Sequence, residues 1–146
     1  NKIKIACNSR RSEDFLIVAR IESFILGKNL NDAIKRAENY SKAGADLILI
    51  HSKKDTPKEI FSFASKFKKS KYFKPMVAVP STYSKVTEKE LIKNGFKVVI
   101  YANHLLRAAY PAMEKIALSI LKNSRSNEVE KEIISIKKIL NIIPQQ

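Results

Sequence analysis

The sequence predicts an α/β protein built around a parallel sheet. Four short segments are rich in β-branched residues and apolar on both alternating sets of side chains: 15–22, 46–52, 76–82 and 98–104. Each is followed by a segment with helical periodicity, and their starts lie 31, 30 and 22 residues apart, which fits repeated strand–helix units. Two architectures accept this pattern: an open doubly wound sheet and part of a (β/α)8 barrel.

The segments between and after the strands carry helix signals. Gly44 and Gly95 stand where two of these helices should end, and Pro111 either lies near a helix start or forces a kink. The chain therefore reads as one domain over 1–146, with strand–helix units to about 123 and a further helix after them. Helices are expected over 30–44, 57–67, 87–95 and 104–123, followed by a C-terminal helix over about 127–143.

Composition points to one globular domain. A chain of 146 residues with 45% hydrophobic residues can bury a core. No segment approaches the roughly 20 apolar residues of a membrane span, and residues 1–13 lack the apolar segment of a secretory signal. We therefore expect a cytoplasmic protein without a membrane partner. Cys7 is the single cysteine, so no internal disulfide or CxxC metal motif exists in this sequence.

Polar and charged residues close all four predicted strands. The carboxyl ends of parallel strands converge on one mouth of a barrel, which is where the active sites of such barrels lie. These closing residues are therefore the first candidates for a functional site. They are Arg20 and Glu22, His51 and Ser52, Ser81 and Thr82, and Asn103 and His104.

The alternation of side chains along a strand favours an anionic ligand. Arg20 and Glu22 share one face of the first strand, and His51 is the last residue of one alternating set on the second. A charge at the inward end of a strand is costly unless water, a partner or a ligand meets it. Arginine suits a carboxylate or phosphoryl group, and histidine can exchange hydrogen bonds with a phosphoryl oxygen. Two other interpretations stay open: an Arg20–Glu22 ion pair and a purely structural strand-end histidine.

Several catalytic motifs are missing from the sequence. Gly27, Gly44 and Gly95 are the three glycines and stand far apart, so there is no P-loop and no dinucleotide fingerprint. HExxH and GxSxG motifs are also absent. Glu22 is the one acid predicted at a strand end, and one carboxylate does not make a site for a divalent cation.

The net charge of +14 comes from dispersed lysines and arginines. There are 28 of them against 14 acids, and the densest run, 66–74, shows no RNA-binding signature around it. We expect solvated lysines that attract anionic small molecules, and no nucleic-acid partner. The alternative is a non-enzymatic basic module that binds RNA through 66–74, which charge reversal at Lys68, Lys69 and Lys71 and salt dependence would test.

Three stretches together resemble phosphoenolpyruvate mutase, in the isocitrate lyase and phosphoenolpyruvate mutase superfamily. They are IVARIESFILGKNLNDAIKRAENYSKAGADLILIHSKK, VAVPSTY and VVIYANHLLRAAYPAM. The resemblance extends from about residue 2 to the tail and corresponds to the C-terminal half of that family. It implies the C-terminal half of a (β/α)8 TIM barrel, with parallel strands 5–8, their helices and C-terminal helices. The implied activity converts phosphoenolpyruvate to phosphonopyruvate, the entry to phosphonate biosynthesis, with Mg2+ as cofactor.

The resemblance also assigns roles to the strand-end residues. Arg20 lies at the position of the arginine that contacts substrate, and His51 at that of the histidine near the transferring phosphoryl group. Both are thus predicted to be catalytic and substrate-binding, with Glu22 supporting the arginine or the water shell of the metal. The alternatives are phosphonopyruvate hydrolase, which has a similar strand end, and carbon–carbon lyases, which usually carry glutamate where this chain has His51.

The first half of the family's barrel contributes features that this sequence lacks. The resemblance places the aspartate nucleophile, the acids around Mg2+ and the gating loop there. We therefore expect the Mg2+ ligands outside this sequence, and no turnover from these 146 residues alone. The family's terminal helices pack between subunits, which implies a homo-oligomer for the full-length protein.

Overall fold

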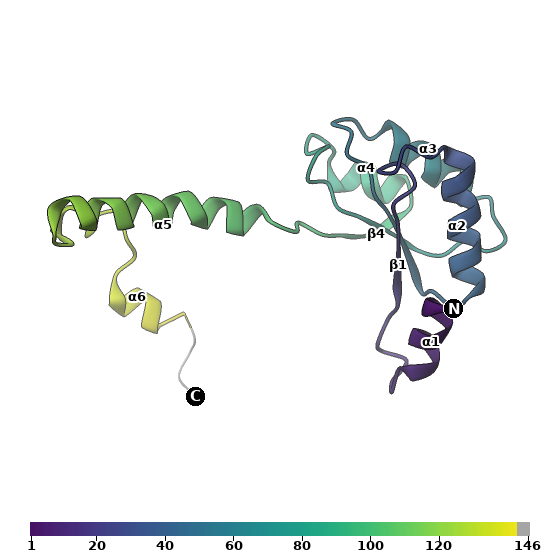
Figure 1. Cartoon of the computed structure of the whole chain (residues 1–146), viewed down its shortest axis with the longest axis horizontal. Coiled ribbons are helices and arrows are strands. Elements are labelled where there is room, and N and C mark those ends of the chain that lie inside the picture. Colours follow the sequence, from purple (N-terminus) through teal and green to yellow (C-terminus); the bar gives the residue numbers. More distant parts are fainter. Residues whose placement is uncertain (143–146) are drawn as a thin grey trace. The chain divides into compact units, whose positions relative to one another are not determined.

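Four parallel strands form the centre of the first of two units. The structure, a computed structural model, describes residues 1–142. Strands β1 (Val18–Ile21), β2 (Leu47–Ile50), β3 (Met76–Ala78) and β4 (Phe96–Val99) lie side by side in that order, and every neighbouring pair is parallel. Figure 1 labels β1 and β4, the two outer strands. A doubly wound sheet reverses its strand order at a switch point, whereas a barrel keeps the order of the sequence. The order therefore favours a segment of a (β/α)8 barrel.

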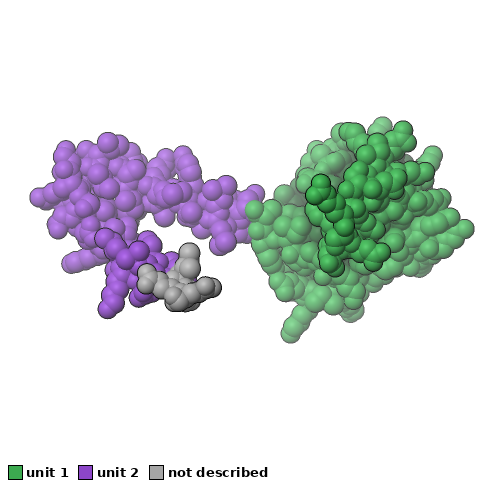
Figure 2. All heavy atoms as spheres, turned by 90° about the horizontal axis from the view of Figure 1, so that it is seen from below, with its two compact units in different colours: residues 1–102 green, residues 103–146 purple. Residues whose placement is uncertain are grey.

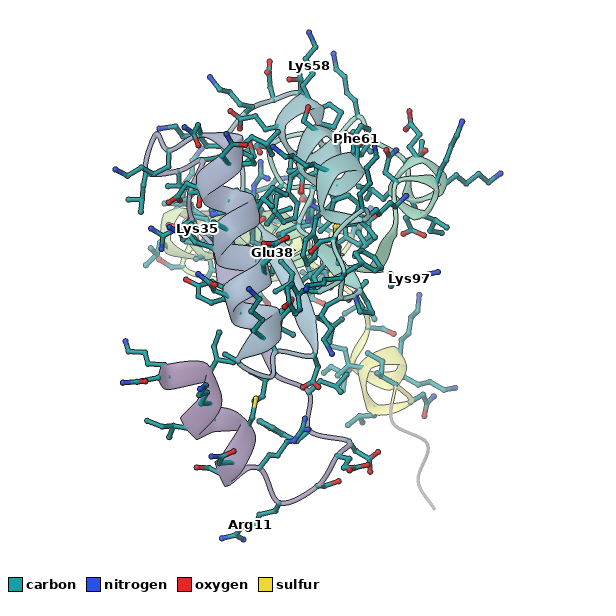
Figure 3. All side chains as sticks on the ribbon, turned by 90° about the vertical axis from the view of Figure 1, so that its right-hand side faces the viewer. Arg11, Lys35, Glu38, Lys58, Phe61 and Lys97 are labelled. Carbon is teal, nitrogen blue, oxygen red and sulfur yellow. The ribbon has the colours of Figure 1, made fainter. Side chains whose placement is uncertain are left out.

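Helices cover one face of this sheet. The helices of the unit are α1 (Lys2–Ser9), α2 (Leu30–Lys42), α3 (Lys58–Phe67) and α4 (Glu88–Lys93). Ala33 of α2 and Phe63 of α3 are fully buried in one cluster with Ile48 and Ile50 of β2. Figure 3 labels Lys35, on the exposed side of α2, and shows the charged side chains along the outer surface of the helices.

The other face of the sheet carries a separate, smaller cluster. Leu47, Leu49 and Val77 are buried there. Val18 of β1 and Val98 of β4, on the two outer strands, are 44% and 41% exposed. A parallel sheet with helices on one side only is what an arc of a barrel wall presents, because the inner face of a complete barrel is covered by the barrel's own side chains.

Glycine ends two of the helices, as predicted. Gly44 follows α2 with φ of 105°, and Gly95 follows α4 with φ of 91°, in a region that side chains with a Cβ rarely adopt. A Cβ atom at Gly44 would also lie 3.0 Å from Cys7 Sγ. The Cys7 thiol donates to the Gly44 carbonyl at 3.1 Å, so this half-buried cysteine ties α1 to the end of α2.

Asp46 connects the start of β2 to the segment before β1. Its carboxylate accepts from the Ile17 backbone N–H at 2.7 Å and from Arg10 Nη1 at 3.0 Å. The Ile17 hydrogen bond lowers the pKa of Asp46; partial burial opposes this shift, and Arg10 adds to it. The carboxylate is therefore the form that stabilises the fold.

Replacing Asp46 with alanine is expected to lower the free energy of unfolding by about 1–2 kcal/mol at pH 7, because two hydrogen bonds to a charged acceptor are lost. Since the folded pKa is depressed, this stabilisation is complete above the ordinary pKa of aspartate, about 3.9, and disappears as pH falls through the folded value. Urea unfolding at several pH values measures both effects. Asp46→Asn, which keeps one acceptor oxygen, should lose less; an unchanged stability in Asp46→Ala would contradict the assignment.

Two predicted strands are misplaced at their carboxyl ends. The prediction of a strand over 98–104 is wrong, since β4 begins at Phe96, whose ring is fully buried, and ends at Val99. Asn103 and His104 instead cap and begin α5 (His104–Asn123). The third strand is also shorter than 76–82, because β3 ends at Ala78. Burial of one aromatic ring thus moved the fourth strand toward the N-terminus.

The second unit, residues 103–146, begins with α5 (Figure 2). The helix continues through Pro111, seven residues after its first residue, so Pro111 does not mark its start. Ser124 ends α5 in the left-handed conformation, with φ of 52°. The boundary between the two units lies near residue 103. No helix of residues 1–142 is long and apolar enough to cross a membrane.

The single helix predicted over 127–143 is wrong for the part that the structure describes. A 3-10 turn, η1 (Asn127–Val129), and a short helix, α6 (Ile136–Leu140), replace it. Val129 is 3% exposed, and η1 packs against α5. The Ser135 hydroxyl accepts from the Lys138 N–H at 3.3 Å and so begins a new helix where the pattern suggested continuity. Residue 143 lies outside the described residues.

Candidate active site

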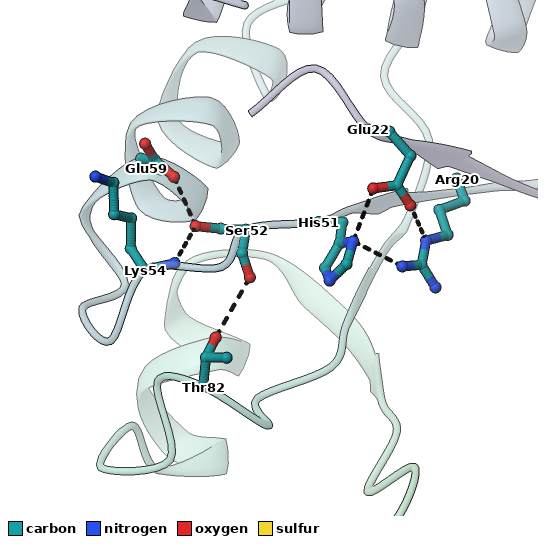
Figure 4. Close-up of polar contacts among 7 residues, drawn as sticks. All are labelled: Arg20, Glu22, His51, Ser52, Lys54, Glu59 and Thr82. Carbon is teal, nitrogen blue, oxygen red and sulfur yellow. Dashed lines mark hydrogen bonds and ion pairs between the residues drawn. The ribbon is translucent and has the colours of Figure 1, made fainter. Parts of the chain in front are cut away.

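Arg20, Glu22 and His51 meet on the inner face of the sheet (Figure 4). The register aligns Arg20 with Leu49 and Ile21 with Ile50, so that Glu22 and His51 follow at the ends of adjacent strands. The His51 backbone N–H donates to the Ile21 carbonyl at 3.1 Å and extends this pairing past β2. The local sequence thus delivers an arginine, a carboxylate and an imidazole to one point at the carboxyl end of β1 and β2.

The three side chains are joined through hydrogen bonds. Arg20 Nε donates to Glu22 Oε1, while Glu22 Oε2 lies 2.8 Å from His51 Nδ1. Arg20 Nη2 also approaches His51 Nδ1, at 2.6 Å. The ion pair of Arg20 with Glu22, left open by the sequence, therefore exists in this structure. It includes His51 as a third member.

His51 Nδ1 cannot make both of its contacts as hydrogen bonds at once. A ring nitrogen that carries a proton donates, here to Glu22; one without a proton accepts, here from Arg20. With Nδ1 protonated, the other nitrogen of a neutral ring is an acceptor; with Nδ1 bare, that nitrogen carries the proton and donates. The cluster therefore has two proton arrangements. A ligand that draws Arg20 to itself favours the one in which His51 donates to Glu22.

The cluster presents a cationic guanidinium and is reachable from solvent. Burial opposes ionisation of Glu22, but hydrogen bonds from His51 and Arg20 and their charges outweigh it and lower the pKa of Glu22. Glu22 is therefore a carboxylate near neutral pH. The side chain of Arg20 is 52% exposed, so its guanidinium can contact a ligand as well as Glu22. A partly exposed guanidinium beside an imidazole is suited to a carboxylate or phosphoryl oxygen.

The structure brings some of the other strand-end residues close to this cluster and not others. Ser52 is 2% exposed and directed away from the inner face, and Thr82 donates to its carbonyl at 3.3 Å (Figure 4). Ser81 lies in the loop after β3, and the prediction of Asn103 and His104 as strand-end partners is wrong, because both belong to the start of α5. The candidate site, which the sequence predicted at the ends of four strands, thus lies at the ends of β1 and β2.

Sequence reasoning missed two buried serine–carboxylate contacts behind the site. Ser23 donates to Asp32 and Ser52 donates to Glu59, at 2.7 and 2.6 Å. The available signal was a serine directly after an inward-facing polar residue, followed by an acid in the first turn of the next helix. Neither residue type is unusual at these positions, and only the structure pairs them.

The described residues do not fit a divalent cation. Residues 1–142 contain no group of three His, Cys, Asp or Glu side chains that could hold a metal ion. Glu22, the acid at the cluster, is held by two potential cations, Arg20 and His51. The one carboxylate of the cluster is thus already paired.

The fold is a segment of a (β/α)8 barrel, and the cluster is a candidate site for an anion at its strand ends. A family model described as phosphoenolpyruvate phosphomutase matches residues 1–121, and the chain belongs to this family. It is 38% identical to phosphoenolpyruvate phosphomutase of Tetrahymena pyriformis over 141 residues, which is 97% of this chain and 46% of that protein.

Solved structures agree with this assignment. The phosphoenolpyruvate phosphomutase of Streptomyces platensis subsp. rosaceus superposes with a TM-score of 0.86 at 36% identity, over 96% of this chain and 48% of that one. A phosphonopyruvate hydrolase in complex with oxalate and Mg2+ superposes equally well, with a TM-score of 0.86 at 36% identity, over 95% and 48%. The chain thus spans about half the length of the proteins that it matches.

Proposed function

We propose that the protein containing this chain is a phosphoenolpyruvate phosphomutase, which interconverts phosphoenolpyruvate and phosphonopyruvate. In that reaction the bond from phosphorus to the enol oxygen breaks and a phosphorus–carbon bond forms within the same molecule. The observation that carries the proposal is the Arg20–Glu22–His51 cluster at the ends of β1 and β2. Its cationic groups are suited to a small molecule with a carboxylate and a phosphoryl group.

In this proposal each residue of the cluster has a separate role. Arg20 binds an oxygen of the substrate and stabilises negative charge that develops during transfer. His51 faces the phosphoryl group with the ring nitrogen that does not face Glu22, and it donates to a phosphoryl oxygen when that nitrogen carries a proton. Glu22 is the supporting residue: it holds Arg20 and orients the His51 ring. None of the three acts as the nucleophile.

We also propose that the protein depends on Mg2+. The support is the hydrolase relative that was solved with oxalate and Mg2+, together with the anionic substrate. The carboxylates that hold the ion would belong to the part of the relatives that this chain does not span, because no suitable group exists among residues 1–142. When bound, the ion supplies charge stabilisation at the phosphoryl oxygens. The homo-oligomer and the cytoplasmic location stay predictions.

The second candidate is phosphonopyruvate hydrolase, favoured by the hydrolase structure at the same identity as the mutase. There the phosphorus–carbon bond breaks and water supplies the new oxygen on phosphorus, which yields pyruvate and phosphate. A carbon–carbon lyase would cleave an organic acid without moving phosphorus. All three reactions begin from a small anionic substrate, so Arg20 would serve each of them.

Phosphorus NMR distinguishes these activities. The complete encoded protein is incubated with Mg2+ and phosphonopyruvate, and the phosphorus signals are followed over time. A growing phosphoenolpyruvate signal is the expected result. A growing inorganic phosphate signal would instead establish the hydrolase, and an unchanged phosphonopyruvate signal from folded protein would overturn the proposal.

A further inference from the structure

Ser52, directly after His51, is held by hydrogen bonds to both its hydroxyl and its backbone carbonyl. Its hydroxyl donates to Glu59 in the first turn of α3 at 2.6 Å and accepts from the Lys54 N–H at 3.1 Å. Its carbonyl accepts from the Thr82 hydroxyl at 3.3 Å (Figure 4). Ser52 is 2% exposed, and its three bonds are partly buried. The backbone that carries His51 is therefore held to the helix layer as well as to the neighbouring strand.

The same arrangement recurs one strand earlier. Ser23 directly follows Glu22, is 1% exposed and donates to Asp32 in the first turn of α2 at 2.7 Å. Its carbonyl accepts from the Lys28 N–H at 2.8 Å. The hydrogen bond from Ser23, together with that from Arg36, lowers the pKa of Asp32, so the acceptor is a carboxylate. In two successive strand–helix units, a buried serine just after the strand thus donates a hydrogen bond to an acid in the first turn of the following helix.

Each of these serines points away from the inner face while the residue before it points toward that face. Glu22 and His51 directly follow β1 and β2, and the serine after each is bonded to the helix layer, so a bond that fixes the serine also restrains the direction of its neighbour. Glu22 and His51 are the neighbours in question, and their side chains contact each other. Neither serine touches Arg20, Glu22 or His51 through a hydrogen bond of its own hydroxyl.

We propose that the Ser23–Asp32 and Ser52–Glu59 pairs are positioning elements that orient Glu22 and His51 toward each other and toward the substrate. The expected effect of these pairs on the reaction rate rests on the proposed function. Their expected effect on the orientation of His51 does not depend on any activity. Without its serine bond, the end of the strand gains freedom and the imidazole samples directions that do not face the phosphoryl group. A displacement of about 1 Å in such a group can cost up to about a hundredfold in rate.

The kinetic test uses Ser52→Ala and Glu59→Ala in the complete protein, with Ser62→Ala, an exposed serine of α3, as the matched control. We expect Ser52→Ala and Glu59→Ala to lower kcat about tenfold and to change KM less than about twofold, because Arg20 still binds the substrate. Glu59→Gln keeps an acceptor oxygen of the same shape and should restore kcat to within about threefold of wild type. Equal kcat values in Glu59→Gln and Glu59→Ala would overturn the proposal.

A second readout follows the His51 ring directly. Imidazole nitrogen NMR reports which ring nitrogen carries the proton, and His51→Gln identifies the His51 signals. In wild-type protein with oxalate added to draw Arg20 away from His51, we expect a proton on Nδ1, facing Glu22. Ser52→Ala should shift the nitrogen signals away from this state, and Ser62→Ala should not. Unchanged His51 signals in folded Ser52→Ala protein would overturn the proposal, even if kcat fell.

The kinetic and the NMR measurements distinguish failure of the proposed function from failure of the positioning role. If wild-type protein transforms neither phosphonopyruvate nor phosphoenolpyruvate, the proposed function fails, and the His51 signals still decide the positioning role. If Ser52→Ala does not fold, Ser23→Ala carries the test through the same signals, since loss of its bond to Asp32 should displace Glu22 from Nδ1. Wild-type signals in folded Ser23→Ala would then overturn the proposal.

Discussion

Replacing Arg20 with alanine is expected to lower kcat/KM for phosphonopyruvate by about a hundredfold to ten-thousandfold. The guanidinium can form two charge-assisted hydrogen bonds to the substrate, each contributing about 1.5–3 kcal/mol, and every 1.4 kcal/mol corresponds to about a factor of ten. Its side chain is 52% exposed, so its loss should leave the free energy of unfolding almost unchanged. Steady-state kinetics and urea unfolding of the same preparation measure both quantities.

Arg11 provides the matched control for this variant. It is an exposed arginine outside the sheet, and Arg11→Ala should retain wild-type kinetics (Figure 3). Arg20→Lys separates charge from geometry: it keeps the charge and loses the planar fork of donors, so an intermediate rate is expected. Near wild-type kcat/KM in Arg20→Ala would remove Arg20 from the substrate site.

Replacing His51 with alanine is expected to lower kcat about a hundredfold or more. The change removes the group proposed to face the phosphoryl oxygens and frees Glu22 to pair with Arg20 alone, which weakens the grip of Arg20 on the anion. Part of the loss should therefore fall on KM. Initial rates over a range of substrate concentrations separate the two contributions.

Glu22→Gln is the informative companion to His51→Ala. It keeps an oxygen near His51 but removes the negative charge, so we expect a smaller loss of kcat than for His51→Ala. His104→Gln, at the start of α5, is the control for the other histidine of this chain and should leave kcat unchanged. If His51→Ala retained more activity than His104→Gln, the assignment of His51 to the phosphoryl group would be wrong.

The strands and helices of the first unit could be predicted because their signals are local. The continuous apolar run ending at Ile50 needs burial on both faces, and the turns at Gly44 and Gly95 need a backbone that other residues rarely adopt. Alternation along a strand likewise placed Arg20 and Glu22 on one face of the first strand before their contacts were known. These predictions depend on residues a few positions apart.

The errors occur where a distant contact outweighs the local pattern. Phe96 begins β4 because its ring is buried among residues from other elements, which no residue near it in the chain reveals. The region around Ser135 has an apolar pattern that fits one long helix, yet the hydroxyl of Ser135 caps a new one. The spacing of apolar residues along the chain reveals neither the burial of Phe96 nor the helix cap at Ser135.

The sequence by itself determined the parallel strand–helix units and the residues at the ends of the first two strands, because these follow from patterns within single segments. Only the tertiary structure decided that Arg20, Glu22 and His51 share hydrogen bonds, and that Ser23 and Ser52 fasten the strands behind them. The physical reason is register. Which residues of two strands lie side by side depends on packing across the whole sheet, and a hydrogen bond requires a donor–acceptor distance within a range of a few tenths of an ångström.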